Sequence, residues 1–181
     1  DWLTAELKIE ARLSLGEGYE SLGRYDAAKA DYQAARRLLA DQPIAEARIW
    51  LRESWLPERV GNYSLCIRLV NRALRCIEGV EGREAEELRS GLWGVYAAHR
   101  YFQGRNREAI EWASKAAEAS ERIGFRQGCA QAYLSLSIAY GDTGDLREAE
   151  RYSELALALY EELGELEPQA QVLNNMGTFS Y

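Results

Sequence analysis

The sequence predicts an all-α fold, an α-α superhelix of about four and a half helical hairpins, and three observations lead to that prediction. A short glycine turn signal recurs along the chain with spacings of 38, 43 and 40 residues, at Gly23, Gly61, Gly104 and Gly144. Small residues follow each glycine after five positions and again after twelve, at Ala28, Cys66, Ala109 and Ala149, and at Ala35, Ala73, Ala116 and Ala156. The composition favours helices, with 47% hydrophobic residues, 28% charged residues and only 3 Pro.

Each recurring feature has a physical reason in a helical hairpin. A turn glycine takes the positive φ that ends one helix and starts a tight connection to the next. Small residues let two antiparallel helices approach closely, where a leucine would hold them apart. Gly16 and Gly177 lie inside expected helices, where glycine costs about 1 kcal/mol relative to alanine, so we expect a close helix crossing at each.

The expected elements follow in order along the chain. First helices are expected near residues 3–22, 44–60, 83–103, 125–142 and 167–181, and second helices near 25–40, 63–78, 106–123 and 145–163. They group into repeats near 3–42, 44–80, 83–124 and 125–164, with a half repeat at 167–181. Pro43 suits the first turn of its helix, whereas Pro57 is expected to kink the helix over 44–60 by removing the backbone hydrogen bond to Glu53. Because the chain begins at Asp1 and the last helix has no partner after it, we expect a single array excised from a larger multidomain protein.

The charge balance excludes several classes of partner. The chain has 29 acidic and 22 basic residues, a net charge of −7, and residues 125–181 carry −6 of it. Nucleic acids and anionic membranes are therefore not expected as partners. Nor does any stretch approach the about 18–20 apolar residues of a membrane-spanning helix. Cys66 and Cys76 are expected on one helix, about 15 Å apart and beyond disulfide reach, which favours a reducing, cytoplasmic location.

The inventory of reactive residues favours a non-catalytic chain. His99 is the only histidine, and no nearby serine or cysteine forms a recognisable nucleophile pair with it. The sequence contains no CxxC, HExxH or GxxxxGK[ST] motif, so we expect no metal, no cofactor and no catalytic residues. Arg68, Arg72 and Arg75 fall on one face of a helix and form either an anion-binding stripe or a solvated convex face, and the solvated face is favoured.

The repeated pattern resembles the tetratricopeptide repeat. The residues that carry the resemblance are Leu15, Gly16, Tyr19, Gly23, Tyr25, Ala28, Tyr32 and Ala35, and later Tyr140, Gly144, Ala149 and Ala156. The resemblance covers about residues 9–181, and the spacing, longer than the usual period of about 34 residues, is similar to a long-repeat subtype. It implies a right-handed solenoid whose first helices line a concave groove for ligands. The second and third repeats depart from the pattern, with Ser54 and Ala97 for the helix glycine and Pro57 and Arg100 for the tyrosine.

In this register the resemblance implies a partner-binding groove with an apolar and aromatic floor. Its residues are Leu51, Trp55, Ala98, Tyr101, Phe102, Leu134, Ile138 and Asn174. Chaperone-binding relatives clamp an acidic C-terminal tail with asparagine, but the matching positions here hold Glu17, Trp55, Ala98 and Ile138, so that ligand is not expected. Asn174 and Asn175 resemble the asparagines that hold peptide backbone in repeats of the kinesin light chain type. The alternative is that Tyr101, Phe102 and Ile138 pack the superhelix itself.

Three functional hypotheses follow. The first is a protein-interaction scaffold that binds a peptide, a helix or a neighbouring domain of its own chain. The second concerns the parent protein, because residues 156–164 and 171–177 resemble the C-terminal repeats of bacterial class III adenylate/guanylate cyclases and of large ATPase-type transcriptional regulators. That resemblance implies a regulatory region of a bacterial signalling protein. The third is self-assembly, including a homodimer, through the end helices.

Overall fold

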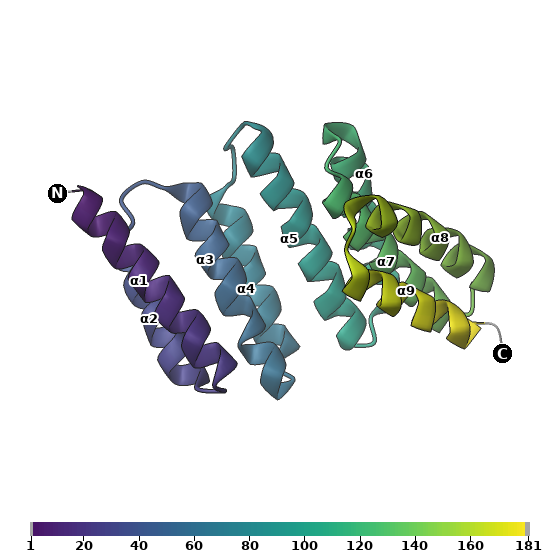
Figure 1. Ribbon diagram of the computed structural model, residues 1–181, viewed down its shortest axis with the longest axis horizontal. Helices are drawn as coiled ribbons and strands as arrows, with labels where there is room; N and C mark the ends of the chain where they lie inside the picture. Colours follow the sequence, from purple (N-terminus) through teal and green to yellow (C-terminus); the bar gives the residue numbers. More distant parts are fainter. Residues whose placement is uncertain (1, 180–181) are drawn as a thin grey trace. The chain divides into compact units, whose positions relative to one another are not determined.

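A computed structural model describes the backbone of residues 2–179 and the side chains of residues 4–177 (Figure 1). Within that range the chain forms nine α-helices and one short 3-10 helix and contains no strand. The half repeat expected at 167–181 therefore extends two residues beyond the described part of the chain. The chain divides into two compact units, Asp1–Val80 (unit 1) and Glu81–Tyr181 (unit 2).

Unit 1 consists of two helical hairpins. Helix α1 (Trp2–Ser21) packs against α2 (Tyr25–Leu38), and α3 (Pro43–Trp55) packs against α4 (Tyr63–Cys76). The two hairpins meet through contacts between α2 and α3. A 3-10 helix, η1 (Pro57–Val60), connects α3 to α4 and contacts both.

Unit 2 consists of two more hairpins and one further helix. Its elements are α5 (Arg83–Phe102), α6 (Asn106–Ile123), α7 (Arg126–Thr143), α8 (Leu146–Leu163) and α9 (Leu166–Phe179). Each helix packs against the next, and α7 also contacts both α5 and α9, so these three first helices form one layer. The described residues thus confirm the all-α class and the four hairpins followed by a single helix.

The turn glycines adopt the conformation that their spacing predicts. Gly23, Gly61, Gly104 and Gly144 have φ angles of 70°, 70°, 72° and 85°, a region that side chains with a Cβ rarely enter. Each lies in the short connection between the two helices of a hairpin.

Pro57 acts differently from the expectation. Helix α3 ends at Trp55, and Pro57 begins η1, so the helix expected over 44–60 stops instead of continuing with a kink. The reason is that proline has no backbone N–H to donate and its ring clashes with the preceding turn. The α-helix therefore gives way to a short 3-10 helix at this position.

The two mid-helix glycines differ in their surroundings. A Cβ on Gly16 would lie 2.5 Å from Cε1 of Tyr32, so the close crossing predicted there is confirmed. Tyr32 is fully buried in the unit 1 core with Ala28, Ala35, Ile49 and Leu56. A Cβ on Gly177 would meet none of the described residues within 4 Å, so the corresponding prediction is wrong.

Candidate functional site

Unit 2 brings together six of the eight residues that the sequence assigns to a binding groove. Ala98, Tyr101 and Phe102 lie on α5, Leu134 and Ile138 lie on α7, and Asn174 lies on α9. Because α7 contacts both α5 and α9, these residues belong to one layer of first helices. We call this layer, with its six residues, the first-helix face of unit 2.

Tyr101 links two helices of the first-helix face. Its hydroxyl hydrogen-bonds to Asp142 near the end of α7, and burial followed by this carboxylate raises the pKa of the Tyr101 phenol above its ordinary value. The ring of Phe102 meets the Tyr101 ring edge-on, with 5.5 Å between centroids, and Phe102 remains 49% exposed. An aromatic pair with this exposure offers apolar area to a partner.

Asp142 contacts Tyr101 and is not among the eight predicted groove residues. The signal for it is its spacing, because Leu134, Ile138 and Asp142 are four residues apart and therefore share one face of α7. Its carboxylate accepts a hydrogen bond from the Tyr101 hydroxyl, which restrains the tyrosine ring at the end of α5. The first-helix face therefore includes a polar contact between α5 and α7 beside its aromatic pair.

The other predicted residues of unit 2 differ in exposure. Leu134 is 9% exposed and packs in a core cluster with Ala130, Ala156, Tyr160 and Val172, so most of its surface is used within the unit. Ile138 is half-buried against the same cluster, and Asn174 is exposed on α9. The accessible part of the face is thus formed by α5 and α9, with α7 supporting it.

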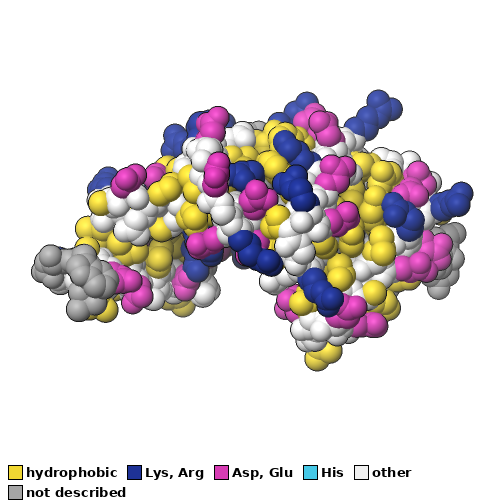
Figure 2. Space-filling model, turned by 90° about the horizontal axis from the view of Figure 1, so that it is seen from above, with side chains coloured by type: hydrophobic (Ala, Val, Ile, Leu, Met, Phe, Trp, Pro, Cys, Tyr) yellow, Lys and Arg dark blue, Asp and Glu magenta, His cyan; other side chains and the backbone are white. Residues whose placement is uncertain are grey.

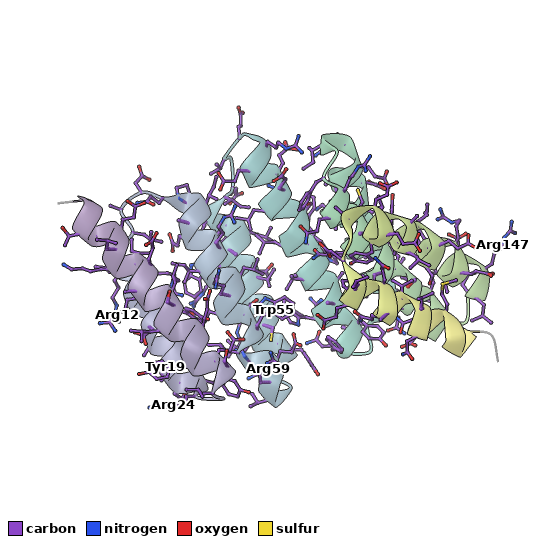
Figure 3. All side chains as sticks on the ribbon, in the orientation of Figure 1. Arg12, Tyr19, Arg24, Trp55, Arg59 and Arg147 are labelled. Carbon is purple, nitrogen blue, oxygen red and sulfur yellow. The ribbon has the colours of Figure 1, made fainter. Side chains whose placement is uncertain are left out.

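The remaining two predicted residues lie in unit 1. Leu51 and Trp55 are half-buried and lie one helical turn apart on α3. Trp55 is labelled in Figure 3. Figure 3 also places Tyr19 and Arg24 at the turn between α1 and α2, where the Arg24 guanidinium lies 4.7 Å from the centre of the Tyr19 ring.

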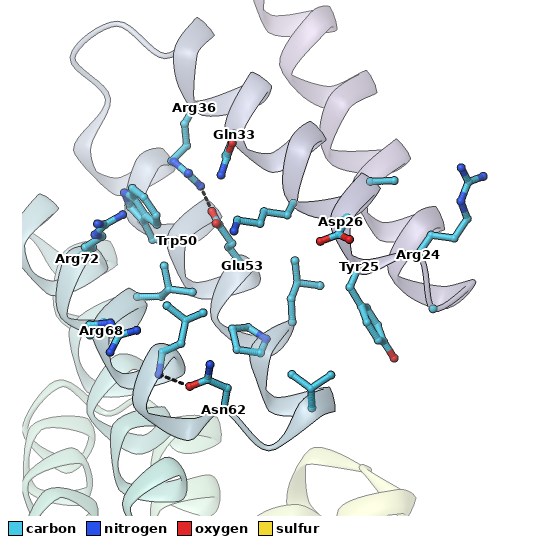
Figure 4. A pocket seen from close by; sticks show the side chains of 18 residues that line it. Arg24, Tyr25, Asp26, Gln33, Arg36, Trp50, Glu53, Asn62, Arg68 and Arg72 are labelled. Atoms are coloured by element: carbon cyan, nitrogen blue, oxygen red, sulfur yellow. Dashed lines mark hydrogen bonds and ion pairs between the residues drawn. The ribbon is translucent and has the colours of Figure 1, made fainter.

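Unit 1 also contains a pocket of about 830 Å³ that the sequence did not predict (Figure 4). The pocket lies between α2 and α4, with residues of α3 and η1 also lining it. Five cationic side chains line it, from Arg24, Lys29, Arg36, Arg68 and Arg72. Its two acidic residues are Asp26 and Glu53, and its apolar lining includes Leu56, Pro57, Val60, Leu65 and Leu69. We call it the α2–α4 pocket.

One sequence feature pointed toward this pocket, the arginine spacing on α4. Arg68 and Arg72 line the pocket, whereas Arg75 does not. The three arginines expected on one solvated face therefore differ in position. Arg68 and Arg72 face the concave surface of the pocket, and Arg75 lies outside it. Helical spacing alone does not distinguish the two cases, because the position of α2 decides which part of the stripe it meets.

An ordered group of side chains fixes one end of the α2–α4 pocket. Arg36 forms an ion pair with Glu53, and their side chains are only 10% and 4% exposed. The guanidinium groups of Arg36 and Arg72 lie 3.5 and 4.9 Å from the centre of the Trp50 ring. The indole N–H of Trp50 donates to Glu46 at 3.1 Å, which sets the orientation of the ring.

Two buried titratable groups, His99 and Cys66, are held neutral near pH 7. Burial lowers the pKa of His99 to about 4, and burial raises the pKa of the Cys66 thiol to about 11. Neither group is thereby activated as an acid, a base or a nucleophile at neutral pH. Among the described residues, no three His, Cys, Asp or Glu side chains gather as metal ligands would.

The distribution of surface side chains is mixed. Figure 2 shows acidic and basic side chains interspersed with apolar ones on the face that it displays. None of the described helices combines the length and the apolar character that crossing a bilayer requires.

Parts of the chain match models of a known repeat family. Two family models, both described as tetratricopeptide repeat, match residues 9–38 and 88–162, together more than half of the chain. A search of curated proteins found no match.

Several solved structures have a similar fold. They include the apo form of RapI (16% identity, TM-score 0.78, covering 97% of this chain and 48% of that one). Aspartyl phosphate phosphatase F from Bacillus subtilis is 13% identical, with a TM-score of 0.75 and coverage of 98% and 52%. A signal-transduction ATPase with numerous domains (STAND) and a tetratricopeptide repeat sensor, from Pyrococcus horikoshii, is 15% identical, with a TM-score of 0.77 and coverage of 96% and 26%. This chain spans about half the length of the first two proteins, and at these identities the similarity concerns the fold.

Proposed function

Since the chain belongs to the tetratricopeptide-repeat family, we propose that it is a non-catalytic protein-interaction scaffold. Its ligand is a peptide, a helix or a neighbouring domain of its own chain, held against the first helices. The observation that carries this proposal is the aromatic pair at the end of α5, where Phe102 stays 49% exposed beside the anchored Tyr101. Aromatic side chains on a rigid helix contribute large contact areas at low entropic cost.

The residues of the proposed groove divide into contact and support. Tyr101, Phe102 and Asn174 contact the ligand, with Asn174 pairing its amide with the ligand backbone. Ala98 leaves room beside them, and Ile138 and Leu134 support the floor. Leu51 and Trp55 belong to unit 1, where they are proposed as ligand contacts on its own first helix, α3.

The proposed biological role of the scaffold is regulation within a cytoplasmic bacterial signalling protein. The similarity to a STAND ATPase with a tetratricopeptide repeat sensor supports a sensor or regulatory region of an ATPase-type regulator. A parent that is a class III adenylate/guanylate cyclase is the alternative, supported by the resemblance of residues 156–164 and 171–177. In both cases the repeats would bind a partner or the catalytic module of the same protein.

The test compares two double variants on opposite types of helix in unit 2. Tyr101→Ala with Phe102→Ala removes the aromatic pair from α5, and Leu146→Ala with Leu155→Ala removes exposed apolar side chains (49% and 39%) from α8. Circular dichroism first shows that the wild-type chain and both variants have native helix content. Each is then used to capture partners from a lysate of the source cells. A partner retained by the α8 variant and lost by the α5 variant supports the proposal. Retention by both variants contradicts the groove assignment.

Self-assembly is a second candidate function, supported by one observation on α9. Leu166 and Leu173 are 77% and 55% exposed and lie seven residues apart, on the same side of the helix. A second copy of the chain would cover this apolar stripe in a homodimer. Light scattering over a range of concentrations tests the idea, and Leu166→Glu with Leu173→Glu is expected to abolish any dimer. A strict monomer at high concentration rules the dimer out.

A further inference from the structure

The structure assigns a second ligand surface to this chain, and we infer that the α2–α4 pocket of unit 1 binds a short acidic peptide segment that also carries apolar side chains. This surface lies between second helices, so it is distinct from the first-helix face of unit 2. The inference stands on the charge, the pairing state and the apolar lining of the pocket.

The charge of the pocket differs from that of its surroundings. Five cations and two carboxylates line it, an excess of three positive charges. Unit 1 as a whole is balanced, with 12 basic and 12 acidic residues, so the excess is local. A concave surface lined by one sign of charge concentrates ligands of the opposite sign. An anionic group is therefore the expected occupant.

Two of the five cations have neither an ion pair nor an aromatic ring contact among the residues that the structure describes. Arg36 is already paired with Glu53, Arg72 lies over Trp50, and Arg24 lies over Tyr19. Lys29 on α2 and Arg68 on α4 are exposed, and neither forms an ion pair among the residues that the structure describes. They belong to the two helices that border the pocket, so carboxylates bound between the helices gain a charge-assisted hydrogen bond from each side.

The apolar lining distinguishes a peptide from other anions. Leu65, Pro57 and Val60 line the same pocket with accessible apolar surface, and Val60 is 73% exposed, whereas Leu56 and Leu69 are already buried. Inorganic phosphate has no group to cover these side chains, whereas leucine-like side chains of a peptide do. The Trp50 ring, which would otherwise stack with a nucleobase, already carries the Arg36 and Arg72 guanidinium groups. Acidic residues interspersed with apolar ones therefore match the pocket best.

The test measures fluorescence anisotropy with a short labelled peptide of alternating Glu and Leu. The protein is the full chain, and the test variant is Lys29→Gln with Arg68→Gln, whose side chains are exposed. We expect at least about tenfold weaker binding, because two charge-assisted contacts are lost. Arg37→Gln with Arg75→Gln is the matched control, since it removes one exposed arginine from each of α2 and α4 outside the pocket. It is expected to keep the affinity within about twofold.

Further arms separate the alternatives. A peptide with Gln in place of Glu and one with Ser in place of Leu are each expected to bind weakly, and binding of the Glu–Leu peptide is expected to weaken with salt. Equal losses of affinity for the control variant and the pocket variant would overturn the inference, because the overall charge of the protein would then explain binding. Displacement of the peptide by inorganic phosphate or by a short RNA at equal concentration would also overturn it. Tyr101→Ala with Phe102→Ala is expected to leave the affinity for the Glu–Leu peptide unchanged. A negative result for the α2–α4 pocket can therefore be distinguished from a negative result for the first-helix face.

Discussion

Unit 1 and unit 2 are built from the same kind of helical hairpin, but they fill the space between helices in different ways. In unit 1 a tyrosine ring, Tyr32, packs directly on Gly16 of the neighbouring helix. In unit 2 one core cluster consists of one leucine and five alanines, namely Ala97, Ala113, Ala116, Ala117, Ala132 and Leu136. The Gly16–Tyr32 crossing thus fits a large side chain against a gap, whereas the alanine cluster lets helix backbones come close together.

The two units also differ in where they place charge. Among the described residues, the buried carboxylates are Asp31 and Glu53 of unit 1, each ion-paired with an arginine. The buried polar residues of unit 2 are serines and His99. Unit 1 carries no net charge, whereas unit 2 has 17 acidic and 10 basic residues and carries the whole −7. We infer that the hairpin fold constrains helix spacing, whereas the sequence of each repeat decides whether its core contains buried ion pairs.

The largest loss of stability is expected when the buried ion pair of unit 1 is broken. Arg36→Ala leaves the Glu53 carboxylate buried without its partner, so the free energy of unfolding is expected to fall by about 3–5 kcal/mol. Arg126→Ala in unit 2 is the control, because it breaks the Arg126–Glu162 pair, whose side chains are 66% and 53% exposed, and should cost at most about 1 kcal/mol. Urea unfolding measures both. Equal losses would remove the distinction between the units.

A second effect is specific to unit 2 and depends on pH. Burial lowers the pKa of His99 from its ordinary value of 6.5 to about 4, so the unfolded chain binds a proton across this window and the folded chain does not. Stability is therefore expected to fall as the pH falls from 6.5 to 4, by about 3 kcal/mol from this residue. His99→Leu should remove that part of the pH dependence in urea unfolding. An unchanged slope in the variant would show that His99 titrates alike in both states.

The third prediction compares glycines in the two units. Gly16→Ala places a methyl group against the buried Tyr32 ring and is expected to cost about 1–3 kcal/mol. Gly94→Ala in α5 meets nothing within 4 Å, and the higher helix propensity of alanine should raise stability by up to about 1 kcal/mol. Thermal unfolding of both variants checks the opposite signs. A loss of stability in both would mean that unit 2 also depends on a tight glycine contact at this site.

The smallest effect is expected to be shared. Asn62 at the start of α4 and Asp145 at the start of α8 each accept a hydrogen bond from a backbone N–H of the first turn, at 3.1 and 3.3 Å. Asn62→Ala and Asp145→Ala should each cost about 1 kcal/mol, because both remove an N-cap. Hydrogen exchange of the first turns of α4 and α8 measures the local loss. A large difference between the two would indicate that the units differ in capping as well as in their cores.

The sequence predicted the repeats because their determinants are local. A positive φ at Gly23 or Gly144 and a small residue at Ala28 or Ala149 follow from a single turn and the helix after it. The end of α3 was predicted less well, because Pro57 is compatible with a kinked helix or with a 3-10 helix. Gly16 and Gly177 look alike in sequence, and only the packing of a neighbouring helix separates them.

The candidate sites depend on packing to a greater degree. The spacing of Leu134, Ile138 and Asp142 predicted a shared face, but it held no sign that Tyr101 would bind Asp142. The α2–α4 pocket draws its residues from elements separated by turns and loops, so no local pattern marks it. Among the three arginines on α4, sequence spacing treats all alike, while the structure separates Arg75 from the other two.

The alanine core of unit 2 also has an evolutionary consequence. Most single-base changes that replace an alanine give a larger or a polar residue, and Ala113 and Ala116 are buried, so a larger side chain there must displace its neighbours. A core of small residues therefore tolerates few replacements. Exposed positions such as Phe102 carry no such packing restriction, so the surface can change in sequence while the helix spacing stays fixed.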